Sequence, residues 1–184
     1  MKEYYNYLKS RSSLGFYYRK FILYPRIKQY SFDKTLDVGC GVGDYLKFDS
    51  KAVGVDINTN CVNHCLDNGL KASVMKIDNL PFETNSFDTL VFDNVLEHIE
   101  DPTKILSEIN RVLNPNGFFI IGVPCEKGYK YDDDHKIFYD IKSLKKLLLK
   151  DYSLEKYFYS PPLFYPFRHL FNQVALYAVF KKHK

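Results

Sequence analysis

Short apolar segments alternate with amphipathic stretches from residue 34 to residue 150, and this alternation restricts the possible folds more than any other feature of the chain. Apolar runs indicate strands at 35–38, 51–55, 72–77, 86–92 and 118–123, and helical patterns occupy 58–68, 102–113 and 141–150. Strands that alternate with helices build βαβ units. Two further strands are predicted at 152–159 and 174–180. We therefore expect an α/β fold with a mostly parallel sheet and helices on both of its faces.

The first 30 residues follow a different pattern, dense in tyrosine, phenylalanine, lysine and arginine. Their apolar positions do not alternate as a strand requires, so we predict one or two helices that end near Pro25 or Ser31. The predicted organisation is an N-terminal helical cap over residues 1–31 and a main domain over residues 32–184, together one compact unit.

The net charge of +4 hides an uneven distribution. Residues 1–31 carry 7 Lys and Arg against 1 acid, residues 32–134 carry 9 against 18, and residues 135–184 carry 10 against 3. The acidic middle therefore lies between two basic ends. Basic ends with interleaved aromatic residues are compatible with nucleic-acid binding.

Several classes of protein are excluded by composition. No run approaches the roughly 20 apolar residues of a membrane span, and the first residues lack the apolar core of a secretory signal. Four cysteines are too few for a disulfide framework in 184 residues, so we expect reduced thiols and a cytoplasmic protein. Cys61, His64 and Cys65 crowd one helical stretch, but no second ligand pair stands at zinc-finger spacing, and we predict no metal site.

Glycines and acids follow the predicted strands at the points where each strand ends. Gly39, Gly41 and Gly43 follow the first strand, and Asp56 and Asp78 follow the second and third. The fourth strand leads into Asp93 and Asn94. Ligands of an open parallel sheet bind at these carboxyl ends, where an acid after the second strand is placed to accept ribose hydroxyls. The pattern predicts a site for a nucleoside-containing cofactor.

The spacing of the glycines selects among such cofactors. A dinucleotide site needs a small residue where this chain has Asp44, and an acid there would face the pyrophosphate. No Gly-Lys-Ser/Thr follows, which excludes a P-loop. A cofactor with adenosine and no phosphate fits better, and S-adenosylmethionine is one.

The run Asp37-Val38-Gly39-Cys40-Gly41-Val42-Gly43 resembles the first motif of the class I S-adenosylmethionine-dependent methyltransferases. Leu80-Pro81-Phe82, Asn94-Val95-Leu96-Glu97-His98-Ile99 and Arg111-Val112-Leu113-Asn114-Pro115 are similar to the small-molecule branch known as type 11. The resemblance covers about residues 34–124. It implies a Rossmann-like, doubly wound, seven-stranded sheet whose last strand is antiparallel, and a methyltransferase domain over residues 32–184. The chain departs from the family pattern in two ways. The helix after Gly43 is short, and Asn116 stands where the family usually has a glycine.

The resemblance also implies a role for each site residue. The backbone of the loop that contains Gly39, Cys40, Gly41 and Gly43 would lie beneath the methionine part of S-adenosylmethionine. Asp37 would steady that loop or bind the amino group. Asp56 would hold the ribose, Ile57 would pack on the adenine, and Asp78 would accept from the adenine amino group beside Asn79 and Leu80. Asp93 and Asn94 would lie near the methyl group.

An oxygen acceptor can require a base within hydrogen-bond reach. The candidate is His135, in the loop after the fifth strand, because that loop lies where the acceptor should bind and histidine titrates near neutrality. A structural histidine is the alternative. Glu97 and His98 are adjacent in a helical stretch and do not face each other, so we expect them to position the next helix. Asp132, Asp133 and Asp134 are consecutive and cannot all turn inward to hold a metal.

Two aromatic segments could line an acceptor pocket: the N-terminus and the proline-stiffened insert at 160–169. Simple packing is the alternative for both. We predict methyl transfer to a small-molecule acceptor, such as a sugar, a glycolipid precursor or another metabolite, at oxygen. A nucleic-acid methyltransferase is second, disfavoured by the acidic edge of the cofactor site and the absence of a recognised RNA module. A non-catalytic partner subunit of the same fold is third, and the intact cofactor acids argue against it.

Overall fold

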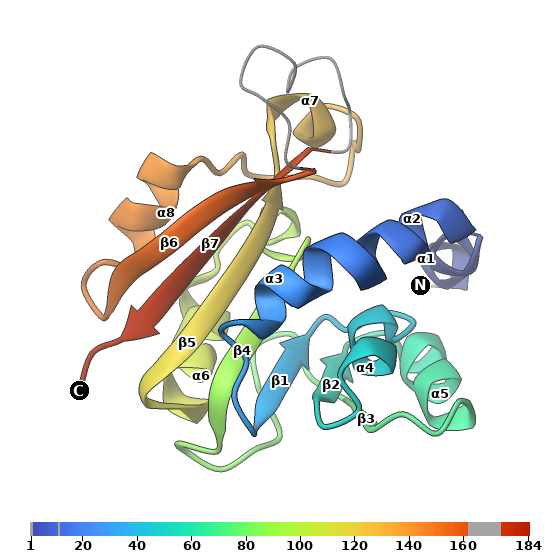
Figure 1. The fold of residues 1–184 in the computed structure, drawn as a ribbon, viewed down its shortest axis with the longest axis horizontal. Helices are drawn as coiled ribbons and strands as arrows, with labels where there is room; N and C mark the ends of the chain where they lie inside the picture. The colour runs from blue at the N-terminus through green and yellow to red at the C-terminus, as the bar shows by residue number, and fades with distance from the viewer. Residues whose placement is uncertain (1, 11, 162–173) are drawn as a thin grey trace.

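The structure, a computed structural model, describes residues 2–10, 12–161 and 174–184. Seven strands form one sheet: β1 (Thr35–Val38), β2 (Val53–Asp56), β3 (Ala72–Val74), β4 (Phe87–Asp93), β5 (Leu113–Pro124), β6 (Tyr152–Ser160) and β7 (Ala175–Lys182). The helices are α1 (Lys2–Lys9), α2 (Ser13–Tyr18), the π-helix η1 (Arg19–Leu23), α3 (Tyr24–Lys28), α4 (Asp44–Phe48), α5 (Thr59–Asp67), the 3₁₀ turn η2 (Leu96–His98), α6 (Thr103–Val112), α7 (Glu126–Tyr129) and α8 (Ile141–Leu148) (Figure 1).

The strand order across the sheet is β3-β2-β1-β4-β5-β7-β6. The pairs among β3, β2, β1, β4 and β5 are parallel, whereas β7 runs antiparallel to β5 and to β6. Chain order reverses between β1 and β4, which is the switch point where ligands of such sheets bind. The predicted α/β, Rossmann-like, doubly wound, seven-stranded fold with an antiparallel last strand is confirmed.

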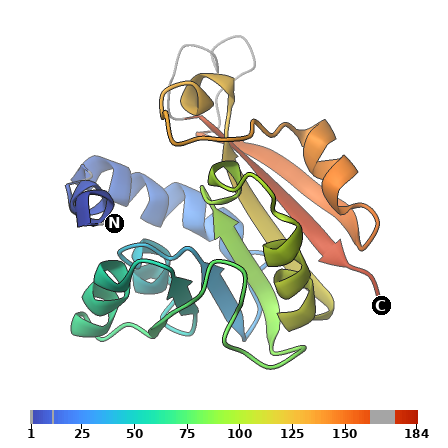
Figure 2. The same cartoon turned by 180° about the vertical axis from the view of Figure 1, so that it is seen from behind.

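Side chains of the central strands alternate between two apolar layers, as the pleat of a strand requires. Leu90 and Phe92 of β4 pack with residues of α6 and α8 on one face. Val91, between them, packs on the other face with residues of α3 and α4. Figure 2 shows α6 and α8 in front of the sheet and the N-terminal helices behind it. Helices therefore cover both faces, as predicted.

Two predicted boundaries are wrong, and each has a local cause. The strand predicted over 72–77 ends at Val74, because β3 is an edge strand that pairs with β2 alone. Asp78 consequently lies in a turn closed by a bridge between Lys76 and Asn79, not at a strand end. The helix predicted over 102–113 ends at Val112, because Leu113 pairs with Phe87 in the sheet. Asn116, which stands in place of a glycine, has a φ of 63°, a left-handed backbone that asparagine tolerates.

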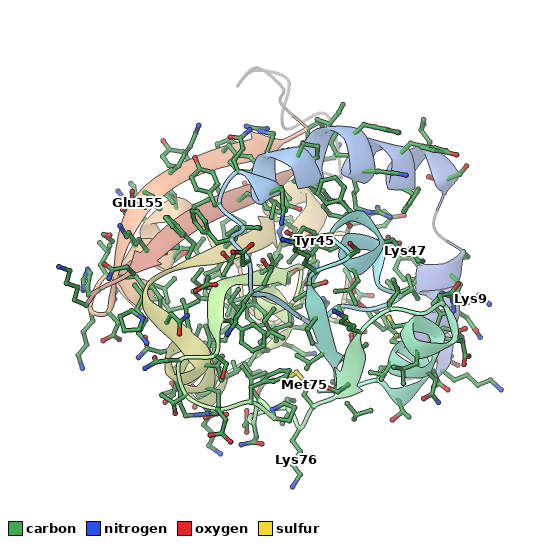
Figure 3. All side chains as sticks on the ribbon, turned by 60° about the horizontal axis from the view of Figure 1, so that its bottom comes forward. Lys9, Tyr45, Lys47, Met75, Lys76 and Glu155 are labelled. Carbon is green, nitrogen blue, oxygen red and sulfur yellow. The ribbon has the colours of Figure 1, made fainter. Side chains whose placement is uncertain are left out.

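The N-terminal segment forms helices, as predicted, with α2, η1 and α3 contiguous from Ser13 to Lys28. Two ion pairs tie them to α4: Arg19 to Asp44 at 2.7 Å and Lys28 to Asp49 at 2.5 Å. In Figure 3, Tyr45 of α4 and Met75 point into the interior, while Lys9, Lys47, Lys76 and Glu155 extend outward. The N-terminal helices therefore lie close to the loop that follows β1.

Candidate functional site

The loop after β1 is a tight glycine turn. The amides of Gly39 and Cys40 both donate to the carbonyl O of Val55, at 2.8 and 3.0 Å, which fastens the loop to β2. Gly39 has a φ of 79°, and a Cβ there would overlap Cγ2 of Val95. Only glycine meets both demands without strain. Glycine at this position therefore lets the turn pack closely against Val95.

Three carboxylates gather around this loop at the ends of their strands. Burial, then the charges of Asp93 and Asp56, raise the pKa of Asp37 well above its usual range. Burial also raises the pKa of Asp56, although its oxygens accept from the amides of Gly41 and Asn58, both at 2.8 Å. Asp93 accepts a hydrogen bond of 2.8 Å from the hydroxyl of Tyr177. This concentration of acids disfavours anions and favours a cationic ligand.

A cavity of about 370 Å³ opens between the glycine loop and the N-terminal helices. Its floor includes Asp37, Gly39, Cys40, Gly41, Asp93 and Asn94. Tyr4, Tyr7 and Leu8 of α1 line its other side, together with Tyr18 and Arg19. Leu8 also packs on Val42 and Cys61, which joins α1 to the glycine loop and to α5. The aromatic N-terminus thus contributes directly to this cavity.

Arg19 is a residue of this cavity that the sequence analysis did not identify. Its Nη2 donates to Oδ2 of Asp44 at 2.7 Å, and its buried Nε has no hydrogen-bond partner among the described residues. Arg19 is the single lysine or arginine among the described residues that line the cavity. The sequence pattern could not identify Arg19, because the ion pair with Asp44 that holds it at the cavity joins two segments 25 residues apart.

The residues predicted to bind adenine lie apart from this cavity. Ile57 is 47% exposed at the end of β2. Asp78 lies 3.7 Å from the ammonium of Lys104, and the backbone amide of Leu80 donates to Glu108 at 2.9 Å. Asn79 Nδ2 also donates to Glu108, at 3.5 Å, and the side chain of Leu80 belongs to the main core. This segment is therefore fastened to α6, with Ile57 and Asp78 open to solvent.

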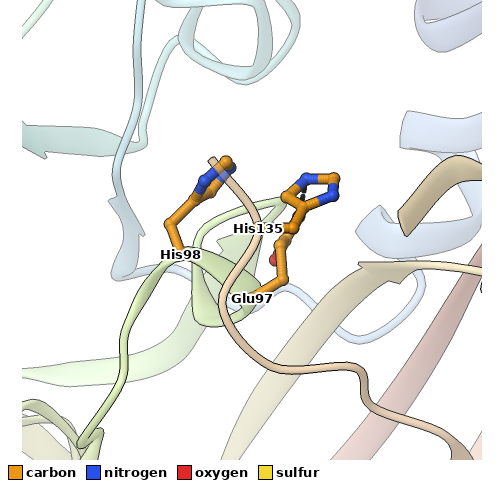
Figure 4. Close-up of side chains that lie close together, drawn as sticks. All are labelled: Glu97, His98 and His135. Atoms are coloured by element: carbon orange, nitrogen blue, oxygen red, sulfur yellow. Dashed lines mark ion pairs between the residues drawn. The ribbon is translucent and has the colours of Figure 1, made fainter. Parts of the chain in front are cut away.

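Glu97, His98 and His135 meet at the opposite end of the cavity (Figure 4). The carbonyl O of Glu97 accepts from the amides of Lys136 and Ile137, at 2.7 and 3.2 Å, which brings the loop after α7 onto η2. His135 Nδ1 lies 2.8 Å from the carbonyl O of Tyr129, so Nδ1 carries the proton and Nε2 the lone pair. His135 Nε2 lies 3.8 Å from Oε1 of Glu97.

The structure therefore brings most of the predicted site residues to one place. The residues that line a single cavity are Asp37, Gly39, Cys40, Gly41, Asp93, Asn94 and His135, and Asp56 holds the loop through Gly41. Gly43 does not line it and packs instead against Leu70 and Cys65. Glu97, which the sequence analysis assigned to helix positioning, also lines this cavity. Residues 162–169 of the predicted aromatic insert lie outside the described residues.

Comparison with known proteins identifies the family. Residues 36–121 match the profile of the type 11 methyltransferase domain. Residues 36–121 belong to this methyltransferase domain family, within the class I S-adenosylmethionine-dependent methyltransferases. The PH0226 protein of Pyrococcus horikoshii has a similar fold and superposes with a TM-score of 0.74 at 19% identity, over 99% of each chain.

Curated relatives of this chain differ in the activities that their names state. The uncharacterized protein MJ1252 of Methanocaldococcus jannaschii is 33% identical over 82% of this chain and 57% of its own length. The sterol 4-C-methyltransferase strm-1 of Caenorhabditis elegans is 33% identical over 56% of this chain and 34% of its own. A human protein named probable tRNA methyltransferase 9B is 32% identical over 54% and 24%. The chain thus spans about half the length of MJ1252 and less of the others.

The residues of this site fit S-adenosylmethionine, the cofactor of that family. The sulfonium and ammonium of that molecule are cations, and they match the acids around the glycine loop, where burial and like charges already raise the pKa of Asp37. Gly39 and Gly41 line the cavity without side chains of their own, so a ligand there can approach the backbone closely.

Proposed function

We propose that this protein transfers the methyl group of S-adenosylmethionine to an oxygen of a small-molecule acceptor. The observation that carries the proposal is the cavity itself, because it joins the cation-favouring acids of the glycine loop to the Glu97–His98–His135 group. Its volume of about 370 Å³ lies within the range of small-molecule sites, about 300–1,000 Å³. We further propose that residues 1–31 act as the cap of this cavity and residues 32–184 as the catalytic domain.

Each part of the cofactor has a candidate partner. When bound, S-adenosylmethionine supplies a methyl group already activated on a sulfonium. Asp37 and the backbone of Gly39 and Gly41 would hold its methionine part, with Asp93 and Asn94 near the methyl group. Arg19, whose Nε is buried without a hydrogen-bond partner among the described residues, is placed to bind the methionine carboxylate. Asp56 would accept from the ribose hydroxyls.

The adenine would lie over the open edge beyond β2. Ile57, 47% exposed, supports this assignment as the apolar surface beneath the ring. Asp78 would accept from the adenine amino group, beside Asn79 and Leu80. The ammonium of Lys104 lies 3.7 Å from Oδ2 of Asp78, at the rim of the proposed adenine position.

An activated donor leaves the protein two tasks, which are to position the acceptor and to handle its proton. His135 supports a role at the acceptor oxygen, because it lines the cavity and its Nδ1 is already bonded to the carbonyl O of Tyr129, which leaves Nε2 for the acceptor. The aromatic rings of Tyr4, Tyr7 and Tyr131 supply apolar walls for the rest of the acceptor. All four cysteines are thiols, which supports the predicted cytoplasmic location.

Charge at the cavity favours a small molecule over RNA. Proteins that hold a nucleic-acid backbone pair several lysines or arginines with its phosphates. Arg19 alone supplies such a charge among the described lining residues, and Asp44 already neutralises it. The carboxylates of three aspartates in the same lining would repel phosphates: Asp44, Asp93 and Asp132.

The test is a transfer assay with methyl-labelled S-adenosylmethionine and a cell extract separated into small-molecule, RNA and protein fractions. The proposal predicts label in the small-molecule fraction with the wild type and little with Asp56→Ala. Label in the RNA fraction that depends on Asp56 would replace the proposed acceptor class with nucleic acid. Absence of transfer to every fraction would favour the non-catalytic alternative.

A further inference from the structure

Glu97 is a buried carboxylate that the fold leaves without a hydrogen bond. Its side chain is 1% exposed, and neither of its oxygens has a hydrogen-bond partner among the described residues. Burial raises the pKa of Glu97 to about 8. A buried carboxylate without donors costs stability, and proteins keep such groups when a ligand or an ion completes them.

Two imidazoles complete a cluster with this carboxylate. One ligand atom each of Glu97, His98 and His135 lie within 4.8 Å of one another. Ligands about 2.1 Å from a single zinc-sized ion stand roughly 3 to 3.5 Å apart. The 3.8 Å from His135 Nε2 to Glu97 Oε1 is close to that separation, so a small inward movement of the side chains would bring them into coordination.

The surroundings orient both imidazoles as ligands. Metal-binding histidines usually donate their second N–H to a carbonyl or a carboxylate, which fixes the other nitrogen on the metal. His135 does this through Nδ1 and the carbonyl O of Tyr129, at 2.8 Å. His98 Nδ1 lies 3.3 Å from the carbonyl O of Asp134. Asp132 Oδ2, 4.0 Å from His135 Nε2, offers a fourth ligand atom at the rim.

We propose that Glu97, His98 and His135 bind one divalent transition-metal ion of the zinc, cobalt or manganese class. Two imidazoles and one carboxylate suit such ions and leave coordination positions open. The open positions face the cavity that all three residues line. This placement departs from the sequence analysis, which predicted no metal.

The role of this ion rests on the proposed function, because the ion would bind the acceptor of the methyl group. A hydroxyl bound to a divalent ion loses its proton to water more readily, because the ion lowers the pKa of that hydroxyl. His135 would then act on the acceptor oxygen as a ligand of the ion. The acceptor class becomes an alcohol or a phenol whose oxygen can occupy an open metal position.

The experiment titrates the metal-free full chain with Co²⁺ alone, under a phosphine reductant, and records its visible absorption. The inference predicts one Co²⁺ per chain with the bands of nitrogen and oxygen ligands and no thiolate charge-transfer band. Glu97→Gln and His135→Asn should each weaken Co²⁺ binding at least about tenfold, since removing a ligand exceeds the loss of a supporting contact. Glu126→Gln and His183→Asn, at exposed positions, should bind as the wild type does.

Folding of the variants is checked without metal. Glu97→Gln should melt at or above the temperature of the metal-free wild type, because it replaces a buried carboxyl group that has no hydrogen bond with an uncharged group of the same size. Wild-type protein that binds no stoichiometric Co²⁺, variants that bind it equally well, or a thiolate band would each overturn the inference. Because the titration contains neither S-adenosylmethionine nor acceptor, its failure leaves the proposed methyl transfer to be judged by its own assay.

Discussion

Replacing Gly39 by alanine tests whether the turn after β1 needs glycine for two separate reasons. The φ of 79° costs any other residue about 1–2 kcal/mol. The added Cβ would also overlap Cγ2 of Val95, and overpacking of this kind costs about 1–3 kcal/mol. Gly69 is a matched control, because its φ is 72° and a Cβ there meets no atom within 4 Å. Gly39→Ala should therefore destabilise the protein by about 2–5 kcal/mol, and Gly69→Ala by about 1–2 kcal/mol.

Urea denaturation of the wild type and both variants measures this difference in the free energy of unfolding. Calorimetry with S-adenosylmethionine should show weakened binding for Gly39→Ala and unchanged binding for Gly69→Ala. Adding Val95→Ala to Gly39→Ala should recover the part of the cost that comes from the overlap. Equal losses of stability at the two glycines would refute the structural reasoning about the turn.

Three further predictions concern side chains that line or support the cavity. The pKa of Asp37 is raised, so stability present at low pH is lost as the pH rises through that pKa. The melting temperature of Asp37→Asn relative to the wild type should thus increase with pH, and a constant difference would contradict this. Tyr177→Phe removes the donor at 2.8 Å from Asp93 and should cost about 1–3 kcal/mol in urea denaturation, while a cost near zero would argue against that hydrogen bond. Arg19→Gln should weaken S-adenosylmethionine binding in calorimetry, and unchanged affinity would remove Arg19 from the cofactor site.

Local patterns were sufficient to predict the sheet and the glycine turn. The apolar run before Gly39 and the glycines themselves lie within nine residues, so the strand and the turn can be recognised together. Asp56 could be assigned to a strand end because its strand, β2, lies inside the sheet and pairs with a neighbour on each side. At β3 the apolar run continues beyond the end of the strand, so the predicted strand was too long. The strand ends early because an edge strand has pairing on one side only.

Contacts between segments that are far apart in the chain could not be predicted from the sequence. Glu97 was interpreted as a helix-positioning residue because it is adjacent to His98, and nothing in the pattern shows that the amides of Lys136 and Ile137 bond to its carbonyl. These two hydrogen bonds hold the loop so that His135 lies close to the Glu97 carboxylate. Arg19 was missed for the same reason, because its partner Asp44 lies 25 residues away.

Calorimetric titration of the full chain with S-adenosylmethionine tests the central claim most directly. We predict one binding site per chain, with affinity strongly reduced in Asp56→Ala, because the buried Asp56 carboxylate holds Gly41 and is proposed to bind the ribose. Asp67→Ala, which removes an exposed acid at the end of α5, should bind as the wild type does. No binding by the wild type, or equal affinity of the wild type and Asp56→Ala, would contradict the assignment of this cavity as a methyl-donor site.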